Sequence, residues 1–438
     1  MQVKINFIVM KHILSKILAV ALVVFAVQSC CCSENSAKSG KVAVKTGIDV
    51  LQENGFAQLK GKRIGLVTNP TGVDKNLVST VDILANAEGV ELVALYGPEH
   101  GVRGNIHAGD HVDSSIDPAT GLPVYSLYGA TRKPTKEMLD SIDAIVYDIQ
   151  DNGCRSFTYI STLGLLMEAA AEYDKEVIVL DRPNPLGGDK VEGCYVEQGY
   201  YSFVSQFKIP YLYGLTVGEL AVLLNEEGLV IGEKGDKEPF KCKLTVVPME
   251  GWSRDLLYTD LDLPWVLPSP HMPQAETVLY YPASGILGEL GYMSIGVGYT
   301  LPFQIFAAPW IVAEDLVAKL DKMDIAGVEF RPLYVKPFYS AYKGENIGGV
   351  QMYVTDFDKV ELTAIQFYVM QAMAELYPEK AVFDNANDGR YRMFDLVCGT
   401  NYVRETFAKT NTFDSIKEYW NKDVAAFKEL SKKYYMYE

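Results

Sequence analysis

The sequence has 438 residues, of which 48% are hydrophobic and 22% are charged, so its composition is that of a globular protein too long for a single core. Its formal net charge of -16 argues against a nucleic-acid-binding protein, because a phosphate-binding surface needs clustered Lys and Arg. We therefore expect two domains and a neutral or weakly charged ligand, with no nucleic-acid partner.

The chain begins with the pattern of a bacterial export signal. Lys11 and Lys16 precede an apolar run over 17–25, which is too short to span a membrane comfortably. This run leads into Val27-Gln28-Ser29-Cys30, a sequence typical of a lipobox. Residues 1–32 are therefore interpreted as a lipoprotein signal peptide and lipobox with Cys30 as the lipidated residue, and the alternative is a signal that is cleaved without lipidation.

A polar tether over residues 33–45 is expected to follow the anchor, because this stretch is rich in Ser, Lys and Gly. The protein would then be attached by its lipid to a membrane of the cell envelope, on the periplasmic or outer-membrane face. Four cysteines follow the signal and its lipobox, too far apart for a metal or redox motif, and we expect small buried thiols: Cys154, Cys194, Cys242 and Cys398.

Apolar runs of strand length alternate with helix-like segments from Thr46 to about Glu192, which predicts an open parallel α/β sheet. The expected strands cover residues 64–67, 92–96, 144–147 and 177–180. Helical periodicity lies between them, at 77–87, 135–141 and 162–173.

Polar segments follow each of the four expected strands, at 68–72, 97–104, 148–155 and 181–188. The carboxyl ends of parallel strands meet at one edge of a sheet, where ligands bind, so we expect a functional cleft there. The alternative is a structural network of ion pairs between the loops. Neither a GxGxxG nor a P-loop motif follows a strand, so a reaction without a cofactor is favoured.

The alternation is less regular beyond residue 210. A capping box at Thr216 and Glu219 opens an expected helix over 215–225, and a strand is expected at 244–249. Residues 264–282 are rich in proline and aromatic residues and are predicted to be an ordered loop, before a glycine-rich stretch at 285–298. Two further strands and two helices are expected at 327–336, 349–355, 363–377 and 413–434.

The string Gly97-Pro98-Glu99-His100-Gly101 resembles the NamZ-type exo-β-N-acetylmuramidase family, which was formerly a domain of unknown function. Similar strings continue in order, so that the resemblance covers nearly the whole chain from about residue 46. They include 121–129, Arg132-Lys133-Pro134-Thr135, Asp148-Ile149-Gln150-Asp151, Tyr159, 180–188, 191–193, 249–252, 268–270 and 308–310.

The resemblance implies a Rossmann-like catalytic domain (46–208) beside a smaller α/β (α+β) domain (209–438), with the active cleft between them. It also implies a glycoside hydrolase that releases N-acetylmuramic acid from the non-reducing end of peptidoglycan fragments. Glu99 would be the main catalytic carboxylate.

Glycosidic cleavage needs an acid and usually a second carboxylate or a group of the substrate. Glu99 can be the acid, and His100 is grouped with it as catalytic. Asp148 and Asp151 are candidates for the second role, as is the acetamido group of the substrate. Arg103, Arg155 or Arg182 could meet the lactyl carboxylate of muramic acid. The other predicted substrate-binding residues are Asn69, Gln150, Tyr159, Asp181, Asn184 and His271.

Three positions depart from the family pattern in a segment expected near the cleft. Tyr292, Ile295 and Val297 stand where many relatives carry Asn, Glu and Arg, and His271 replaces an Asn after Pro270. These changes leave two alternatives open, namely a glycosidase with a different sugar specificity and a non-catalytic lipoprotein that binds muropeptides or another glycan. A metal-assisted hydrolase is a third reading, whose only local ligand cluster would be His100, His107, Asp110, His111 and Asp113.

Overall fold

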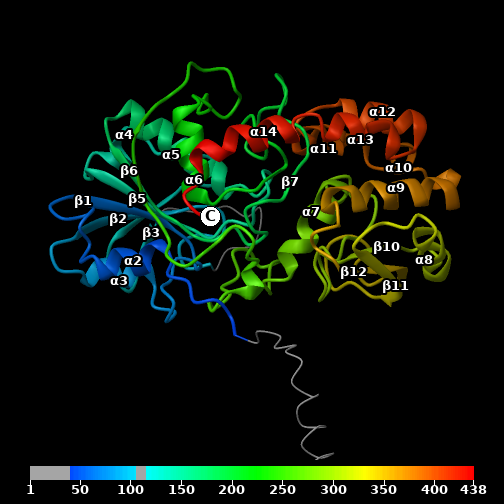
Figure 1. Cartoon of the computed structure of the whole chain (residues 1–438), viewed down its shortest axis with the longest axis horizontal. Coiled ribbons are helices and arrows are strands. Elements are labelled where there is room, and N and C mark those ends of the chain that lie inside the picture. The colour runs from blue at the N-terminus through cyan, green and yellow to red at the C-terminus, as the bar shows by residue number, and fades with distance from the viewer. Residues whose placement is uncertain (1–39, 105–114) are drawn as a thin grey trace, which may run out of the picture. The chain divides into compact units, whose positions relative to one another are not determined.

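The computed structural model describes residues 40–104 and 115–438, and a seven-stranded sheet organises its first lobe (Figure 1). The strand order is β3-β4-β2-β1-β5-β6-β9, parallel except for the pairing of β3 with β4. The bounds are β1 Arg63–Thr68, β2 Glu91–Gly97, β3 Ser115–Ile116, β4 Pro123–Ser126, β5 Ala144–Asp148, β6 Glu176–Leu180 and β9 Lys243–Val247.

The four strands expected in the first part of the chain are confirmed as β1, β2, β5 and β6. All five residues of β5 are buried, as expected for a strand covered on both faces. The strand order reverses between β1 and β5, so the carboxyl ends of these strands border the crevice in which sheets of this kind bind ligands. The polar loops therefore do converge on one edge.

Helices cover both faces of this sheet. Helices α2 (Gly47–Glu53) and α3 (Thr80–Asn86) pack on one face, through Ile48, Leu51 and Leu84. The other face is covered by α4 (Lys136–Leu139), α5 (Tyr159–Glu172) and α6 (Val217–Glu226). The first lobe is thus a three-layer α/β structure, as the sequence predicts. A small two-stranded sheet joins β7 (Val191–Glu192) to β8 (Leu212–Tyr213).

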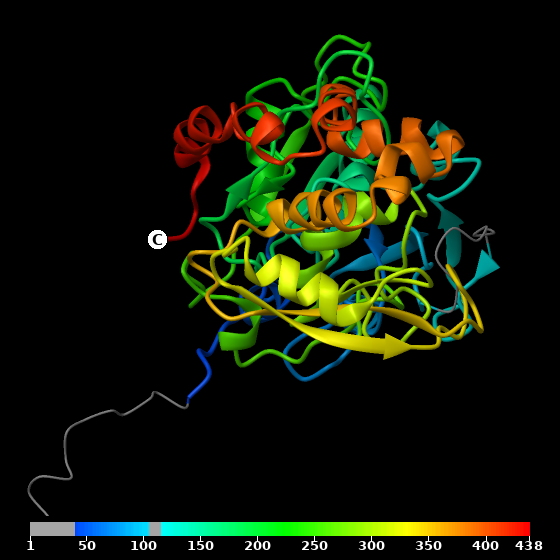
Figure 2. The ribbon, with the colours of Figure 1, turned by 90° about the vertical axis from the view of Figure 1, so that its right-hand side faces the viewer.

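The second lobe contains a three-stranded antiparallel sheet in the order β10-β12-β11, formed by Ile305–Ala308, Ile347–Val354 and Val328–Val335. Helix α8 packs against β11 and β12 of this sheet and against helix α9. Figure 2 shows both helices above β11. The helices of this part are α7 Thr277–Gly288, α8 Ala313–Asp321, α9 Ile365–Leu376, α10 Val382–Asn385, α11 Tyr391–Cys398, α12 Tyr402–Thr410, α13 Asp414–Trp420 and α14 Val424–Ser431. Short 3-10 turns lie at 258–260, 362–364, 378–380, 388–390 and 432–434.

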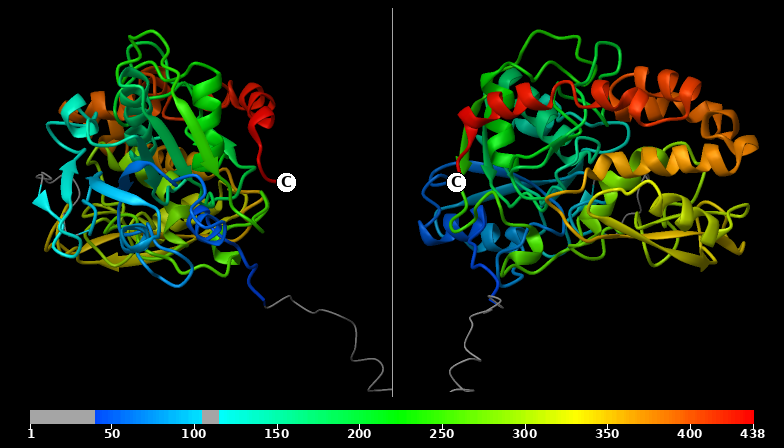
Figure 3. Two further views of the ribbon diagram at one scale, coloured as in Figure 1. Left: turned by 90° about the vertical axis from the view of Figure 1, so that its left-hand side faces the viewer. Right: turned by 45° about the vertical axis from the view of Figure 1, so that its right-hand side comes forward.

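The C-terminal segment returns from the second lobe to the first, as Figure 3 shows for the red helix α14 and the chain end. The hydroxyl of Tyr437 donates a hydrogen bond to Asp181, and the carbonyl of Glu438 accepts one from the backbone of Arg254. Residues 42–438 accordingly form one compact unit.

Three sequence expectations need correction. The boundary expected after residue 208 falls inside the first lobe, because β9 pairs with β6 in the seven-stranded sheet. The loop expected over 264–282 ends earlier, because α7 begins at Thr277 and contains Pro282. The helix expected over 413–434 is divided into α13 and α14, with a 3-10 turn at its end. In the described part of the chain, no helix has both the length and the apolar character needed to cross a bilayer.

Candidate active site

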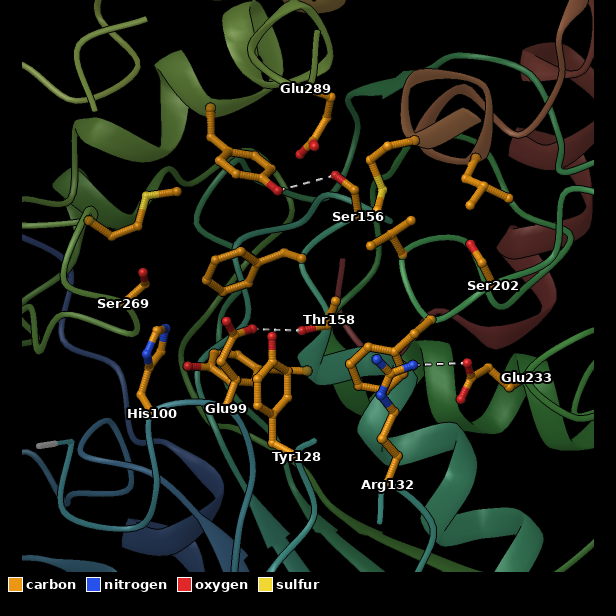
Figure 4. A pocket seen from close by; sticks show the side chains of 18 of the residues that line it. Glu99, His100, Tyr128, Arg132, Ser156, Thr158, Ser202, Glu233, Ser269 and Glu289 are labelled. Carbon is orange, nitrogen blue, oxygen red and sulfur yellow. Dashed lines mark hydrogen bonds and ion pairs between the residues drawn. The ribbon is translucent and has the colours of Figure 1, made fainter. Parts of the chain in front are cut away.

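A cavity of about 530 Å³ opens where the strand-end loops of the first lobe face the second lobe (Figure 4). The loops after β2, β4 and β5 contribute one wall, and α7 contributes to the other. Its described lining is Glu99, His100, Tyr128, Arg132, Ser156, Phe157, Thr158, Tyr159, Ser202, Phe203, Val204, Glu233, Ser269, Met272, Tyr281, Glu289, Phe303, Met393 and Leu396.

Glu99 is presented to the cavity by a tight turn after β2. The backbone amide of Gly101 donates to the carbonyl of Pro98 at 2.9 Å, which closes the turn around Glu99 and His100. His100 has a φ of 72°, a left-handed conformation that non-glycine residues seldom adopt and that is often found at functional sites. The turn therefore fixes the position of Glu99 at the end of a buried strand.

Two hydroxyl groups lie against the Glu99 carboxylate. Thr158 Oγ1 donates to Glu99 Oε2 at 3.4 Å, and Tyr128 also hydrogen-bonds Glu99. Burial, followed by the charge of Glu99 and this hydrogen bond, raises the pKa of the Tyr128 hydroxyl to about 12. Tyr128 therefore stays protonated at neutral pH and can act as a donor to the carboxylate.

Of the residues predicted from the sequence, Glu99, His100 and Tyr159 line this cavity. Tyr159 is held by a hydrogen bond from its hydroxyl to the carbonyl of Pro268, which ties α5 to the proline-rich loop. His271 lies in the same loop between Ser269 and Met272, and its Nε2 atom is 2.7 Å from the hydroxyl of Tyr339. His271 is therefore near the cavity but is not among its described lining residues.

Asp148, predicted as a second catalytic carboxylate, is buried outside the described lining and paired with Arg182. Asp148 Oδ1 lies 2.5 Å from Arg182 Nε, and Oδ2 accepts from Arg182 Nη2 at 2.9 Å and from Thr80 Oγ1 at 2.5 Å. The remaining bond of Arg182 goes to the carbonyl of Val73. These contacts give both residues a structural role, close to the alternative of a loop ion-pair network.

Asp151 is also buried away from the described lining. It accepts hydrogen bonds from the hydroxyl of Tyr213 and from the backbone amide of Gly153. Burial raises the pKa of Asp151 to about 7, and both hydrogen bonds oppose the rise. The side-chain amide of its neighbour Gln150 donates hydrogen bonds to the carbonyls of Asp151 and Pro183. Gln150 therefore holds the loops after β5 and β6 together.

Three further predicted binding residues fold the strand-end loops. The side-chain oxygen of Asn69 accepts from the hydroxyl and amide of Thr71. Asn184 bridges the carbonyl of Leu215 and the amide of Leu186. Asp181 accepts from Tyr437, Thr216 and two backbone amides, while burial raises its pKa to about 6. The described lining contains none of the three.

The other two predicted arginines are also engaged elsewhere. Arg103 forms a two-pronged pair with Asp117 at 2.9 and 3.0 Å and lies 3.7 Å from Asp82. Arg155 is fully buried and donates five hydrogen bonds, four of them to backbone carbonyls. Its acceptors are Ser205 Oγ and the carbonyls of Cys194, Ile209, Val397 and Cys398. Neither guanidinium belongs to the described lining of the cavity.

Several lining residues were missed because the sequence does not show which loops meet. Tyr128 and Arg132 lie within strings that carry the family resemblance, so their place after a strand could have identified them. Thr158 follows the segment after β5. Glu233 lies in an irregular stretch without a motif, and only its distance of 2.9 Å to Arg132 Nη1 brings it to the site.

A second hollow of about 340 Å³ shares Tyr281, Glu289 and Phe303 with the first cavity. Ile295 and Val297, two of the departures from the family pattern, line it. Burial raises the pKa of the Glu289 carboxyl, and Arg390 opposes this from 3.4 Å. The third departure, Tyr292, is buried against Trp310 instead. The altered segment therefore lies beside the cavity.

The four cysteines behind the signal are buried and unpaired, as expected. Within residues 40–104 and 115–438, no group of three or more His, Cys, Asp or Glu side chains is arranged to hold a metal ion. Several predictions fall on residues outside the described part of the chain, namely the signal and Cys30, and the possible ligands His107, Asp110, His111 and Asp113.

Comparisons with known proteins cover almost all of the described chain. Residues 64–276 match the family model "Exo-beta-N-acetylmuramidase NamZ, N-terminal", and residues 279–437 match its C-terminal counterpart. A curated relative, the peptidoglycan beta-N-acetylmuramidase NamZ of Bacillus subtilis (strain 168), is 43% identical over 91% of this chain and 92% of its own.

Two solved structures of DUF1343 family proteins from Bacteroides fragilis NCTC 9343 are also similar. One is 58% identical with a TM-score of 0.87, over 91% of this chain and all of that chain. The other is 29% identical with a TM-score of 0.70, over 90% and 99% of the two chains. Both fold and sequence therefore agree over the two lobes.

Proposed function

The chain belongs to the NamZ family of exo-β-N-acetylmuramidases, and we propose that it removes N-acetylmuramic acid from the non-reducing ends of peptidoglycan fragments with Glu99 as its main catalytic carboxylate. The chain is a glycoside hydrolase by its relationship to the curated muramidase. The observation that supports Glu99 is its position on a fixed turn, facing a cavity large enough for a sugar.

The proposed reaction begins with proton transfer from Glu99 to the oxygen of the scissile glycosidic bond. That bond breaks as positive charge develops at the anomeric carbon, and the leaving sugar departs with the proton. Glu99, now a carboxylate, then takes a proton from the water that completes hydrolysis. Tyr128 and Thr158 hold the carboxyl group in place through both steps.

The second role falls to the substrate's own acetamido group. Of the three groups considered from the sequence, Asp148 and Asp151 are buried in contacts that hold the loops. The carbonyl oxygen of the acetamido group would attack the anomeric carbon, and water would open the resulting ring. Two displacements at one carbon retain its configuration.

Sugar release from a nitrophenyl β-N-acetylmuramide tests the proposed function. Wild type should cleave it, and Glu99→Gln should lower kcat by about a thousandfold or more, since acid–base groups contribute about 10² to 10⁴. Thr158→Val should cost less than tenfold because it removes a supporting contact only. Binding without cleavage of any tested glycan would instead support the non-catalytic alternative.

The anomer formed first, followed by NMR, tests the second role. We expect retention of configuration and inhibition by a thiazoline analogue of the cyclised acetamido intermediate. An inverted product, together with loss of activity in Glu289→Gln, would assign the second role to Glu289 on the other wall of the cavity (Figure 4).

We also propose that the protein is a lipoprotein of the cell envelope. The support is the apolar run over 17–25 followed by Val27-Gln28-Ser29-Cys30. Cys30→Ala should move the protein from the membrane fraction to the soluble fraction and abolish incorporation of labelled palmitate. A wild-type protein that takes up no label would contradict lipidation and favour a plainly cleaved export signal.

A further inference from the structure

Among the described residues, Arg132 is the one arginine that lines the cavity containing Glu99. The loop after β4 places it there, beside Tyr128. In Figure 4 its guanidinium group points from the first lobe toward Glu233. The cavity thus carries a fixed positive charge within the space that a sugar would occupy.

The guanidinium group has a defined orientation and an unused donor. Its central carbon lies 4.3 Å from the centre of the Phe203 ring, which holds the plane of the group. Nη1 is 2.9 Å from Glu233 Oε1. Nε is buried and meets no acceptor in the described part of the chain, although a buried donor of a charged group is costly to leave without a partner.

The Arg132–Glu233 pair is well suited to exchange. The two side chains are 36% and 32% exposed, so neither is locked in the protein interior. Glu233 comes from an irregular segment between α6 and β9. By contrast, Arg182 and Arg155 are buried and have their hydrogen bonds satisfied by the protein itself.

We propose that Arg132 forms a carboxylate-binding subsite for the lactyl group of the terminal muramic acid, which displaces Glu233 from the guanidinium group. This inference rests on the proposed function and names the contact that would recognise its substrate. A carboxylate that takes the place of Glu233 would make the paired hydrogen bonds that arginine favours with the terminal nitrogens of this side chain, which is 36% exposed. No covalent bond changes in the exchange.

The subsite lies close to the reacting group. The pKa of the Tyr128 hydroxyl is raised by the charge of Glu99 and lowered by that of Arg132, so both charges act on one hydroxyl group. Glu99, Tyr128 and Arg132 also line the same cavity of about 530 Å³, so a sugar whose glycosidic oxygen meets Glu99 lies in the space that Arg132 borders. Without the lactyl group, Glu233 would remain paired with Arg132 and no binding energy would be gained.

The test compares three nitrophenyl glycosides: the β-N-acetylmuramide, its lactyl methyl ester and the β-N-acetylglucosaminide. Arg132→Gln should lower kcat/KM for the muramide by about 10- to 100-fold, as expected for a hydrogen-bonded charge, and leave the other two substrates within about threefold. Glu233→Gln should lower KM for the muramide because the competing carboxylate is gone. Arg63→Gln is the matched control, because Arg63 lies at the amino end of β1, away from the cavity. This variant should leave kcat/KM unchanged for all three substrates.

Binding of the free sugars separates this inference from the proposed function. In calorimetry, Arg132→Gln should weaken N-acetylmuramic acid at least tenfold but not N-acetylglucosamine, whether or not any glycoside is cleaved. If wild type cleaves no glycoside but its binding follows this pattern, the proposed hydrolysis is overturned and the subsite is kept.

Two results would overturn the subsite. One is an equal loss on all three substrates in Arg132→Gln while its thermal unfolding matches wild type, and the other is no loss on the muramide. Arg132→Lys guards against misfolding, because it keeps the positive charge and should retain part of the preference for the free carboxylate over its ester.

Discussion

Glu99 and Asp148 both lie at the carboxyl end of a strand in the same sheet, but their surroundings give them different properties. Glu99 is half-buried on a turn beside two hydroxyl groups, whereas Asp148 is fully buried and paired with Arg182. A buried ion pair contributes little net stability, but removing one partner leaves an uncompensated charge. Stability measurements can therefore distinguish the structural carboxylate from the one proposed to be catalytic.

Asp148→Asn should lower the free energy of unfolding by about 3–5 kcal/mol, because Arg182 would remain buried without a counter-charge. Glu99→Gln should change it by less than about 1 kcal/mol, since that side chain faces the cavity. Urea unfolding followed by circular dichroism measures both. A loss in Glu99→Gln as large as in Asp148→Asn would mean that Glu99 also holds the loops.

The pH dependence of stability provides a second prediction at this scale. Burial raises the pKa of Asp151 from 3.8 to about 7, so between these values the native state holds a proton that the unfolded state releases. This contribution is fully present below pH 3.8 and is lost as the pH rises through about 7. The loss of this contribution from pH 4 to pH 8 should lower the free energy of unfolding of wild type by at most about 4 kcal/mol.

Asp151→Asn should flatten this part of the profile, because an uncharged amide can accept the same two hydrogen bonds from Tyr213 and Gly153. Unfolding in urea at one-unit pH steps from 4 to 8 measures the slope. A variant with the wild-type slope would show that other buried acids, such as Asp181, account for it.

The sequence predicted that strand-end loops would meet, but not which side chains would face the cavity. Asn69, Gln150 and Asn184 have residue types suited to sugar binding, yet their hydrogen bonds go to neighbouring backbone and hydroxyl groups. The direction of a side chain in an irregular loop depends on tertiary contacts that no local pattern encodes. This is why the convergence of the loops was predictable and the detailed site was not.

Elements with strong local signals were predicted best. The capping box at Thr216 and Glu219 is present at the start of α6, where Thr216 Oγ1 accepts from the Glu219 amide at 3.1 Å. Helix α7 was missed because Pro282 and the surrounding aromatic residues indicated a loop. Its place in the second lobe is maintained by packing and by Gln366, which donates to the carbonyl of Pro282 at 2.9 Å.

The cap of α6 carries a testable energetic contribution. Thr216 Oγ1 also donates to Asp181 at 2.7 Å, so one hydroxyl joins the helix to the loop after β6. Thr216→Val keeps the volume but loses both bonds, and should cost about 2 kcal/mol. Thr216→Ser keeps the hydroxyl and should cost less than about 1 kcal/mol. Equal losses in urea unfolding would attribute the effect to packing.

At the scale of the whole molecule, the fold class was predictable while the boundary between the lobes was not. Four strands and their helices follow a regular alternation, but β9 joins the same sheet after a long irregular stretch. The C-terminal helix α14 then packs back on the first lobe through Phe427. A boundary drawn where the alternation ends therefore divides a sheet that the tertiary fold keeps whole.

Arg155 connects the two lobes through backbone groups. Its Nη1 atom donates to carbonyls of the first lobe, at Cys194 and Ile209, while Nη2 donates to Val397 and Cys398 at the end of α11. The last carbonyls of a helix have no partner within the helix, so this guanidinium satisfies two of them across the interface. The cavity lies between the same two lobes and depends on their relative position.

Arg155→Met should therefore uncouple the lobes as well as destabilise them. Four buried carbonyls would lose the guanidinium donor, and only those of Val397 and Cys398 would keep a weaker contact, to Ser205 Oγ at 3.5 Å and Cys194 Sγ at 3.8 Å. A total cost above about 2 kcal/mol follows even at the lower end of the range for each unsatisfied group. Scanning calorimetry should show two transitions where wild type shows one. Muramidase activity should fall at temperatures below the first transition, because the wall carrying α7 would no longer face Glu99.

Arg331→Met, on the exposed face of β11, is the control and should leave one transition. A single transition in Arg155→Met, with wild-type activity, would show that packing alone holds the lobes together.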